Sequence, residues 1–317
     1  VVVDTGAVQN IPFRAQVQVG LGPLLRQPLH EESGSVRARL VQEPRVSPDG
    51  KQLAFSALGR VHVMNLRAGA VPQRLTRDGP PEYQPAWSQD GRSIAYVTWT
   101  SAGGAIWLAD AATGRTRRLT RDDAFFFSDV VFAPEGGAVL ALRSSAEERR
   151  QTLQEPMWTG RTGGFLRQAE LVQLSLSDGA MRVIASGPMD GAPQFTGERD
   201  RLYLHTDAGL EAIARDGSWR KSALQVVGPG YYFSESPAPA SHIKISPEAR
   251  HALVLHSQQL YLVTLPAPDA TAVPIDLSRT GASVQRLTGV GADFSSWDAN
   301  GASLNWTLGS TFFRMPL

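Results

Sequence analysis

A four-residue turn motif recurs six times along the chain and constrains its fold more than any other feature. The clearest copies are Ser47-Pro48-Asp49-Gly50 and Ser88-Gln89-Asp90-Gly91, and the weaker copies begin at Ala133, Thr196, Ser246 and Asp298. In such tetrads Pro presets φ at the second position, Asp or Asn bonds to nearby backbone, and Gly takes the positive-φ position. Each copy therefore predicts a tight turn.

Apolar residues keep a fixed register around every turn. The residue just before the tetrad is apolar in each copy: Val46, Trp87, Phe132, Phe195, Ile245 and Trp297. The positions six and eight residues after the start of the tetrad are also apolar, as at Leu53 and Phe55. Even spacing is the period of a β-strand, so each repeat predicts a β-hairpin.

Two further strand-like stretches follow each complete hairpin, and three copies end the last stretch with Arg-Leu-Thr, at 74–76, 118–120 and 286–288. Four short strands per repeat predict an all-β fold, a six-bladed β-propeller of four-stranded antiparallel blades. The expected blades cover about residues 38–77, 82–121, 127–186, 190–226, 240–288 and 291–317.

The sixth repeat reaches Leu317 without a fourth strand. A strand-like stretch at about residues 8–19 belongs to no complete blade, so we expect this N-terminal strand to close the last blade. Closure would remove the open sheet edge that the ring would otherwise expose. It implies that residues 1–317 form a single domain.

The repeats resemble the periplasmic TolB-like propellers, whose blades carry a Trp-Ser-Pro-Asp-Gly-Lys pattern. The stretches 55–61, 82–88 and 94–99 look like the propeller region of bacterial TolB-like proteins fused to metal-dependent amidohydrolases. Trp306-Thr307-Leu308-Gly309 is similar to a stretch near the junction with the hydrolase barrel in such fusions. The barrel's His-x-His metal pair is absent from this sequence, so the resemblance implies no catalytic residue here.

Charge and composition exclude several classes of function. The 317 residues include 31 Lys and Arg against 30 Asp and Glu, and a net charge of +1 provides no basic field for nucleic acid or an anionic membrane. The absence of Cys excludes disulfides, thiol nucleophiles and Cys-based metal sites. No run approaches the roughly 20 apolar residues of a membrane helix, so we expect no membrane insertion.

Known catalytic and cofactor motifs are missing from the sequence. It contains no Gly-x-Ser-x-Gly elbow, no P-loop and no complete Gly-x-Gly-x-x-Gly. The nearest histidine pair, His251 and His256, has an odd separation that places the two rings on opposite faces of a strand. We therefore predict no catalytic residue, no metal and no cofactor in this chain.

Polar residues recur two and four positions before the tetrads. The candidate channel residues are Glu43, Arg45, Gln84, Asp129, Gln194, His242 and Lys244. Positions at these even distances before the tetrads are much more polar than the positions at odd distances. We therefore expect these side chains to line the upper channel around water or a ligand.

Three long loops, at 20–38, 144–168 and 226–240, fall on one face of the predicted propeller by strand counting. Loops of this length are usually functional or disordered. Arg and aromatic residues are typical of interface hot spots, so the candidate partner-binding residues are Arg149, Arg150, Trp158, Arg161, Tyr231 and Tyr232. A protein domain or peptide is the expected partner of this face, and the alternative is that the loops only cap the ring.

The favoured function is a non-catalytic scaffold, substrate-gating or docking module of a larger secreted or periplasmic protein, which the resemblance identifies with a metal-dependent amidohydrolase. A stand-alone protein- or peptide-binding propeller is the second hypothesis, and a propeller enzyme with a site in the central channel is the third. The chain begins Val1-Val2-Val3 with no Met and no signal peptide, so we expect it to be a processed or excised piece.

Overall fold

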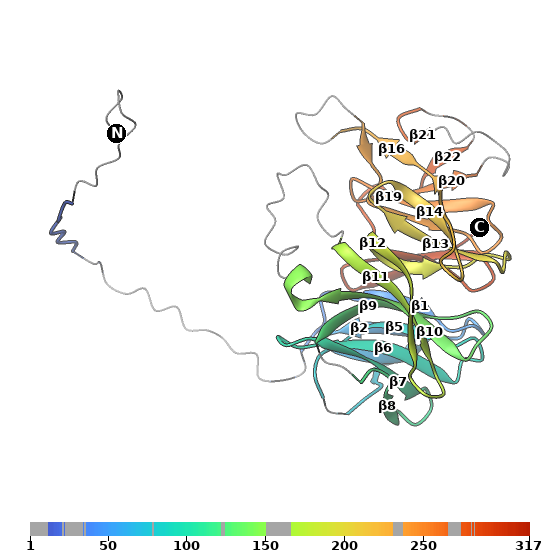
Figure 1. Cartoon of the computed structure of the whole chain (residues 1–317), viewed down its shortest axis with the longest axis horizontal. Helices are drawn as coiled ribbons and strands as arrows, with labels where there is room; N and C mark the ends of the chain where they lie inside the picture. The colour runs from blue at the N-terminus through green and yellow to red at the C-terminus, as the bar shows by residue number, and fades with distance from the viewer. Residues whose placement is uncertain are drawn as a thin grey trace. The chain divides into compact units, whose positions relative to one another are not determined.

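Antiparallel β-sheets dominate the computed structural model, which describes residues 12–20, 22, 34, 36–77, 79–121, 124–149, 166–230, 237–265, 274–279, 281 and 283–317. The chain divides into two compact units, residues 1–37 and residues 38–317. The sheets belong to the second unit (Figure 1). No helix in the described part of the chain is long and apolar enough to cross a membrane.

The first two repeats form one four-stranded sheet each. The strands of the first sheet are β1 (Gln42–Val46), β2 (Gln52–Ala57), β3 (Arg60–Asn65) and β4 (Gln73–Arg74), paired in that order. Those of the second are β5 (Glu82–Trp87), β6 (Ser93–Trp99), β7 (Gly104–Asp110) and β8 (Thr116–Arg118), also paired in chain order.

The third and fourth repeats share a seven-stranded sheet because β12 serves both. Its strands are β9 (Phe125–Phe132), β10 (Ala138–Ser145), β11 (Leu166–Ser175), β12 (Met181–Gln194), β13 (Arg201–Thr206), β14 (Gly209–Ala214) and β15 (Arg220–Leu224). The first part of β12 pairs with β11, and its end pairs with β13 at Asp190 opposite His205 and Gln194 opposite Tyr203.

The last two repeats form a four-stranded and a three-stranded sheet. The first contains β18 (His242–Ile245), β19 (His251–His256), β20 (Gln259–Thr264) and β22 (Val284–Arg286), and the second contains β23 (Asp293–Trp297), β24 (Ser303–Leu308) and β25 (Thr311–Pro316).

The loop predicted at 226–240 carries strands at its two ends, which corrects the expectation of an unstructured connection. A small sheet has the order β17 (Ala238–Pro239), β16 (Val226–Gly228) and β21 (Ile275–Asp276), with β16 parallel to β21. Backbone pairing with residues distant in sequence produces these strands, and local periodicity contains no sign of it.

The predicted turn is confirmed in the tetrads that begin at Ser47, Ser88, Ala133, Ser246 and Asp298, each of which closes with a backbone bond from its fourth residue to its first. Gly50 N donates to Ser47 O at 2.8 Å, and Ser47 Oγ accepts from Gln52 N while donating to Asp49 Oδ1. The tetrad at Ser88 repeats these contacts. Gly50 adopts φ +72°, a backbone conformation that favours glycine because it lacks a Cβ.

The Arg-Leu-Thr sequences join the third and fourth strands of their sheets. Leu119 N donates to Ile106 O at 2.8 Å, and Ile106 N donates to the Thr120 hydroxyl oxygen at 3.2 Å. Leu260 N makes the equivalent bond to Thr288 Oγ1 at 2.9 Å. In these two copies the Thr side chain thus supplies the acceptor that a backbone carbonyl would supply in a longer strand.

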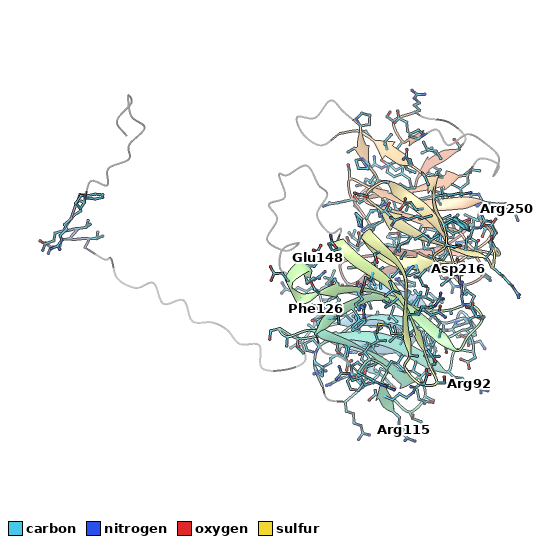
Figure 2. All side chains as sticks on the ribbon, in the orientation of Figure 1. Arg92, Arg115, Phe126, Glu148, Asp216 and Arg250 are labelled. Carbon is cyan, nitrogen blue, oxygen red and sulfur yellow. The ribbon has the colours of Figure 1, made fainter. Side chains whose placement is uncertain are left out.

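Apolar side chains pack within and between neighbouring sheets. Ile106 of β7, Phe127 of β9 and Leu174 of β11 belong to one buried cluster that spans two sheets. Full burial of such a side chain contributes roughly 1.5–3 kcal/mol. Charged residues such as Arg92, Arg115 and Asp216 lie instead at exposed positions in the connections between strands (Figure 2).

The closing strand predicted at about residues 8–19 is not confirmed. Residues 12–20 have no regular secondary structure, and all their side chains are exposed. The β23–β24–β25 sheet contains three strands among the described residues. An isolated strand satisfies none of its own backbone groups, so its formation depends on pairing with a sheet edge.

Candidate functional site

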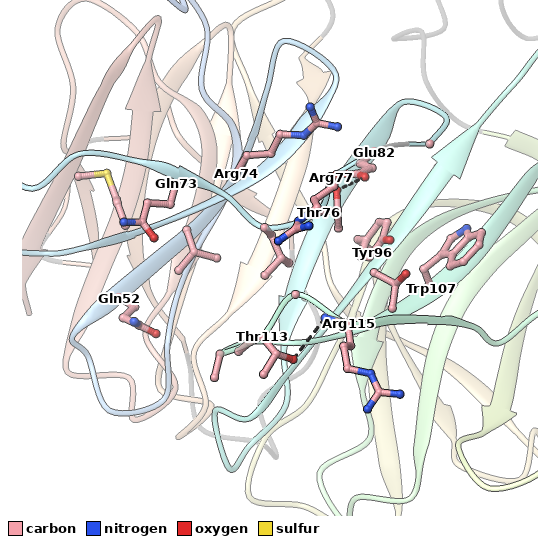
Figure 3. A pocket seen from close by; sticks show the side chains of 18 of the residues that line it. Gln52, Gln73, Arg74, Thr76, Arg77, Glu82, Tyr96, Trp107, Thr113 and Arg115 are labelled. Carbon is pink, nitrogen blue, oxygen red and sulfur yellow. Dashed lines mark hydrogen bonds between the residues drawn. The ribbon is translucent and has the colours of Figure 1, made fainter.

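A cavity of about 900 Å³ lies between the outer strands of the first two sheets (Figure 3). At its base, Glu82 is almost completely buried; its Oε2 accepts from Val61 N at 3.0 Å, and its Oε1 accepts from the Thr76 hydroxyl. Arg60 Nη1 lies 3.5 Å from the same carboxylate. Because these contacts join the two sheets, we assign Glu82 a structural role.

A second cavity, of about 390 Å³, is lined by residues from β1, β5, β9, β12, β18 and β23, which are the first strands of the six repeats. Six of the candidate channel residues line it: Glu43, Arg45, Gln84, Asp129, His242 and Lys244. We call this space the central cavity. It brings together side chains that are distributed over two hundred residues of sequence.

A recurrent β-bulge shapes the wall of the central cavity. Glu43, Gln84, Asp129 and Phe294 each lie four residues before a tetrad, and their φ angles are +47° to +58°. Each lies where the pairing of the first and second strands shifts register. A bulge bends the strand and redirects a side chain, and positive φ costs a non-glycine residue energy, so four strained residues recur at one level of the cavity.

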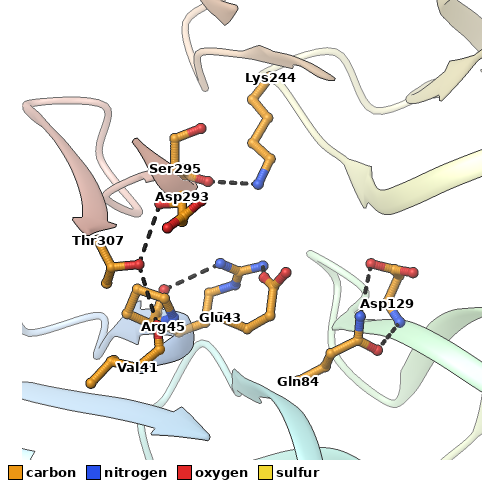
Figure 4. A network of polar contacts seen from close by, with 10 residues as sticks. Val41, Glu43, Arg45, Gln84, Asp129, Lys244, Asp293, Ser295 and Thr307 are labelled. Carbon is orange, nitrogen blue, oxygen red and sulfur yellow. Dashed lines mark hydrogen bonds and ion pairs between the residues drawn. The ribbon is translucent and has the colours of Figure 1, made fainter. Parts of the chain in front are cut away.

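Opposite charges pair within the wall (Figure 4). Arg45 Nη2 donates to Glu43 Oε2 at 2.7 Å, and Lys244 Nζ donates to Ser295 O at 2.6 Å. Gln84 and Asp129 join neighbouring first strands through two bonds: Asp129 N donates to Gln84 Oε1 at 2.8 Å, and Gln84 Nε2 donates to Asp129 Oδ1 at 3.3 Å. The wall therefore presents both signs of charge.

Burial and crowding shift the pKa values of the acids in this wall. Burial, reinforced by the neighbouring Asp190 and Glu43 carboxylates, raises the pKa of Asp129 to about 6. Burial also raises the pKa of Asp190 to about 6. Burial alone would raise the pKa of Glu43, but the Arg45 guanidinium, with Lys244 and His242, keeps it below its ordinary value.

Burial lowers the pKa values of basic groups in and beside the wall. Burial lowers the pKa of His205 to about 3, with the neighbouring His242 and Lys244 adding to the effect. Burial and Lys244 lower the pKa of His242 to about 4. Burial also lowers the pKa of Lys244. Both imidazoles are therefore neutral at pH 7, the form in which histidine binds metals.

Gln194 does not line the central cavity, which corrects its place among the candidate channel residues. Its Nε2 donates to Ile243 O at 2.9 Å, and its Oε1 accepts from Ile245 N at 2.7 Å. Both backbone groups belong to β18, so the amide joins two first strands instead of facing a ligand.

Arg149, predicted in a partner-binding loop, contributes to the wall of the central cavity. It ends a short helical turn at 146–149, and its guanidinium lies 5.5 Å from the centre of the Trp99 ring. The other candidate partner-binding residues, Arg150, Trp158, Arg161, Tyr231 and Tyr232, lie outside the described residues.

Three acidic or histidine residues of this region were missed by sequence reasoning. Asp190 and Asp293 line the central cavity, and His205 lies beside Asp190 as its partner across the β12–β13 pair. Asp190 lies six residues before a tetrad, at the same parity as the candidate channel residues but beyond the two positions that identified them. Asp293 lies five residues before a tetrad, at the opposite parity. His205 belongs to a second strand, so no local pattern could associate it with a channel lined by first strands.

Comparison with family models finds no match for this chain. Among curated proteins, it is 46% identical over 52 residues to the Tol-Pal system protein TolB of Coxiella burnetii, an alignment that covers 16% of this chain and 12% of that protein. It is 24% identical over 197 residues to the uncharacterized peptidase YuxL of Bacillus subtilis, covering 56% of this chain and 28% of the relative. The matches thus span a small part of each relative's length.

Solved structures show similarity over most of the chain. TolB from Acinetobacter baumannii has a TM-score of 0.55 at 15% identity, covering 87% of this chain and 60% of that one. A gluconolactonase from Xanthomonas campestris has a TM-score of 0.59 at 15% identity, covering 88% and 86%. An oligogalacturonate lyase from Vibrio parahaemolyticus has a TM-score of 0.55 at 13% identity, covering 87% and 89%. At these identities the likeness establishes the fold alone: the chain has a TolB-like β-propeller fold.

Proposed function

We propose that this propeller is a non-catalytic docking module whose central cavity binds a polar segment of a protein or peptide partner. The observation that carries the proposal is the convergence of first strands from all six repeats on one cavity with charges of both signs. A polypeptide segment can present acidic and basic side chains to such a wall, whereas a ligand of one charge would face repulsion from part of it.

The arrangement of the charges supports a preorganised binding surface. The Glu43–Arg45 ion pair, the Lys244–Ser295 contact and the Gln84–Asp129 pair hold their side chains in defined positions. A partner then loses less conformational freedom on the protein side when it binds.

Peptide arrays test this proposal. Short peptides with both acidic and basic residues are compared with peptides of one charge sign, using the labelled chain as the probe. Mixed-charge peptides should bind, and Lys244→Met should weaken binding at least about tenfold. The control is Lys51→Ala, which removes an exposed charge immediately after the first tetrad. The proposal fails if no peptide class binds or if Lys244→Met binds as the wild type does.

We further propose that the repeats form six blades and that residues 8–19 complete the last one. β25 is an edge strand among the described residues, and its Phe313 is 37% exposed, as expected of a surface that another strand could cover. Deletion of residues 1–20 should then lower the midpoint of thermal unfolding by several degrees. An unchanged midpoint would contradict closure.

Finally, we propose that the chain belongs to a larger secreted or periplasmic protein of the amidohydrolase type. The partial similarity to TolB supports the location, and the sequence resemblance supports the type of parent protein. The intact mass of the native gene product tests this proposal. A mass well above 34.2 kDa is expected, and a mass near 34.2 kDa would contradict it.

A further inference from the structure

Asp190, His205 and His242 bring three potential metal ligands together at the edge of the central cavity. Each offers one ligand atom, and these atoms all lie within 4.8 Å of one another. His242 Nδ1 lies 3.6 Å from Asp190 Oδ2, and the centres of the two imidazole rings are 5.7 Å apart. The three residues come from β12, β13 and β18, so two neighbouring repeats build the cluster.

This spacing is close to that of a coordination sphere. Ligand atoms at about 2.0–2.2 Å from a tetrahedral Zn²⁺ lie about 3.4 Å from one another. The His242–Asp190 distance already approaches this value, and a ligand atom of His205 lies within 4.8 Å of both partners. Backbone pairing of Asp190 with His205 fixes the relative position of two of the three residues.

We propose that Asp190, His205 and His242 bind one divalent transition-metal ion with an open coordination position toward the central cavity. Two imidazoles and one carboxylate suit Zn²⁺, Mn²⁺, Fe²⁺ or Co²⁺, whereas Ca²⁺ and Mg²⁺ prefer oxygen ligands. His205 is 3% exposed and forms the buried side of the site, while Asp190 and His242 line the cavity. Three protein ligands with a free position are typical of metal sites that exchange ligands.

The surroundings of the cluster indicate the class of exogenous ligand. Lys244, two residues from His242, donates to Ser295 O and is held by that contact. Arg45 and Arg149 line the same cavity as Asp190 and His242. A carboxylate group at the open position would therefore lie in a cavity that also holds cationic groups. The metal site does not depend on peptide docking, because its ligands belong entirely to this chain.

Calorimetric titration of the untagged, chelator-treated chain with Zn²⁺ tests the inference, and the visible absorption of added Co²⁺ reports the coordination geometry. We expect one ion per chain. Asp190→Asn and His242→Ala should each weaken Zn²⁺ binding at least about tenfold. His251→Ala, which removes a histidine outside the cluster, should bind as the wild type does.

Circular dichroism must show that each variant remains folded. His205 is too deeply buried for its substitution to be the primary test, so the binding measurements use variants of Asp190 and His242, which are more exposed. The site is refuted if the wild type binds no Zn²⁺ stoichiometrically or if Asp190→Asn and His242→Ala bind Zn²⁺ as tightly as the wild type. Loss of binding in His251→Ala alone would place the ion elsewhere and equally refute it.

Discussion

The indole Nε1 of Trp297 donates a hydrogen bond to the backbone carbonyl oxygen of Lys244, 2.8 Å away. Trp87 makes the same bond to Arg45 O at 3.0 Å. Each tryptophan immediately precedes a tetrad, and each acceptor lies two residues before the tetrad of the preceding repeat. The repeated bond thus fixes the backbone at two cationic residues of the central cavity.

Trp297→Phe should remove this bond while retaining an aromatic ring. We expect a loss of about 1 kcal/mol in the free energy of unfolding, measured by urea denaturation. Trp306→Phe is the matched control because Trp306 stacks on Phe313 with ring centres 5.2 Å apart. If both variants lose equal stability, indole size rather than the hydrogen bond explains the effect.

Glu82→Ala should destabilise the contact between the first two sheets. The substitution leaves the Val61 N–H without its carboxylate acceptor and removes the anion beside Arg60. We expect a loss of about 2–4 kcal/mol in the free energy of unfolding, and a smaller loss for Glu82→Gln, which retains one acceptor oxygen. Glu135→Ala, which removes the exposed partner of an ion pair with Arg215, should cost less than about 1 kcal/mol. Equal losses from Glu82→Ala and Glu135→Ala would contradict the assigned role.

Thr120→Val should test the role of the Arg-Leu-Thr sequence. Valine keeps the shape but leaves the buried Ile106 N–H without an acceptor, so we expect a loss of about 1–3 kcal/mol in the free energy of unfolding. Thr116→Val, at an exposed position of β8, should change stability by less than about 0.5 kcal/mol. Indistinguishable melting temperatures for the two variants would show that the hydroxyl is dispensable.

Asp129 should make stability depend on pH. Its pKa in the folded chain is about 6, above the value of about 3.9 in an unfolded chain, so the folded state binds the proton more tightly. This contribution to stability is complete below about pH 4 and is lost as the pH rises through 6. The charged groups facing Asp129 include Glu43, Asp190 and Lys244.

Asp129→Asn remains neutral at every pH. We therefore expect it to exceed the wild type in stability by an amount on the order of 1 kcal/mol at about pH 7.5, and to match it near pH 4, with chelator present. Asp216→Asn changes an exposed turn residue and should provide no gain at pH 7.5. A gain for Asp129→Asn that persists at pH 4 would mean that the cost of ionising a buried carboxylate, reinforced by Asp190 and Glu43, is not its source.

Turn chemistry and period-two alternation predicted the hairpins correctly, because both depend on residues within a few positions of each other. The Ser47 and Ser88 tetrads close their turns through side-chain contacts with residues two to five positions away. The polar character of the positions two and four residues before each tetrad identified six residues of the central cavity. It misplaced Gln194, whose amide binds the backbone of a neighbouring first strand.

The sequence by itself determined the repeat, its hairpins and the polar character of the first strands, since these follow from short-range hydrogen bonds and side-chain alternation. Only the tertiary structure decided which first strands bulge, that Glu82 joins two sheets, and that Asp190, His205 and His242 meet. Those relationships join residues far apart in the chain. They depend on how neighbouring sheets pack, which local sequence patterns do not encode.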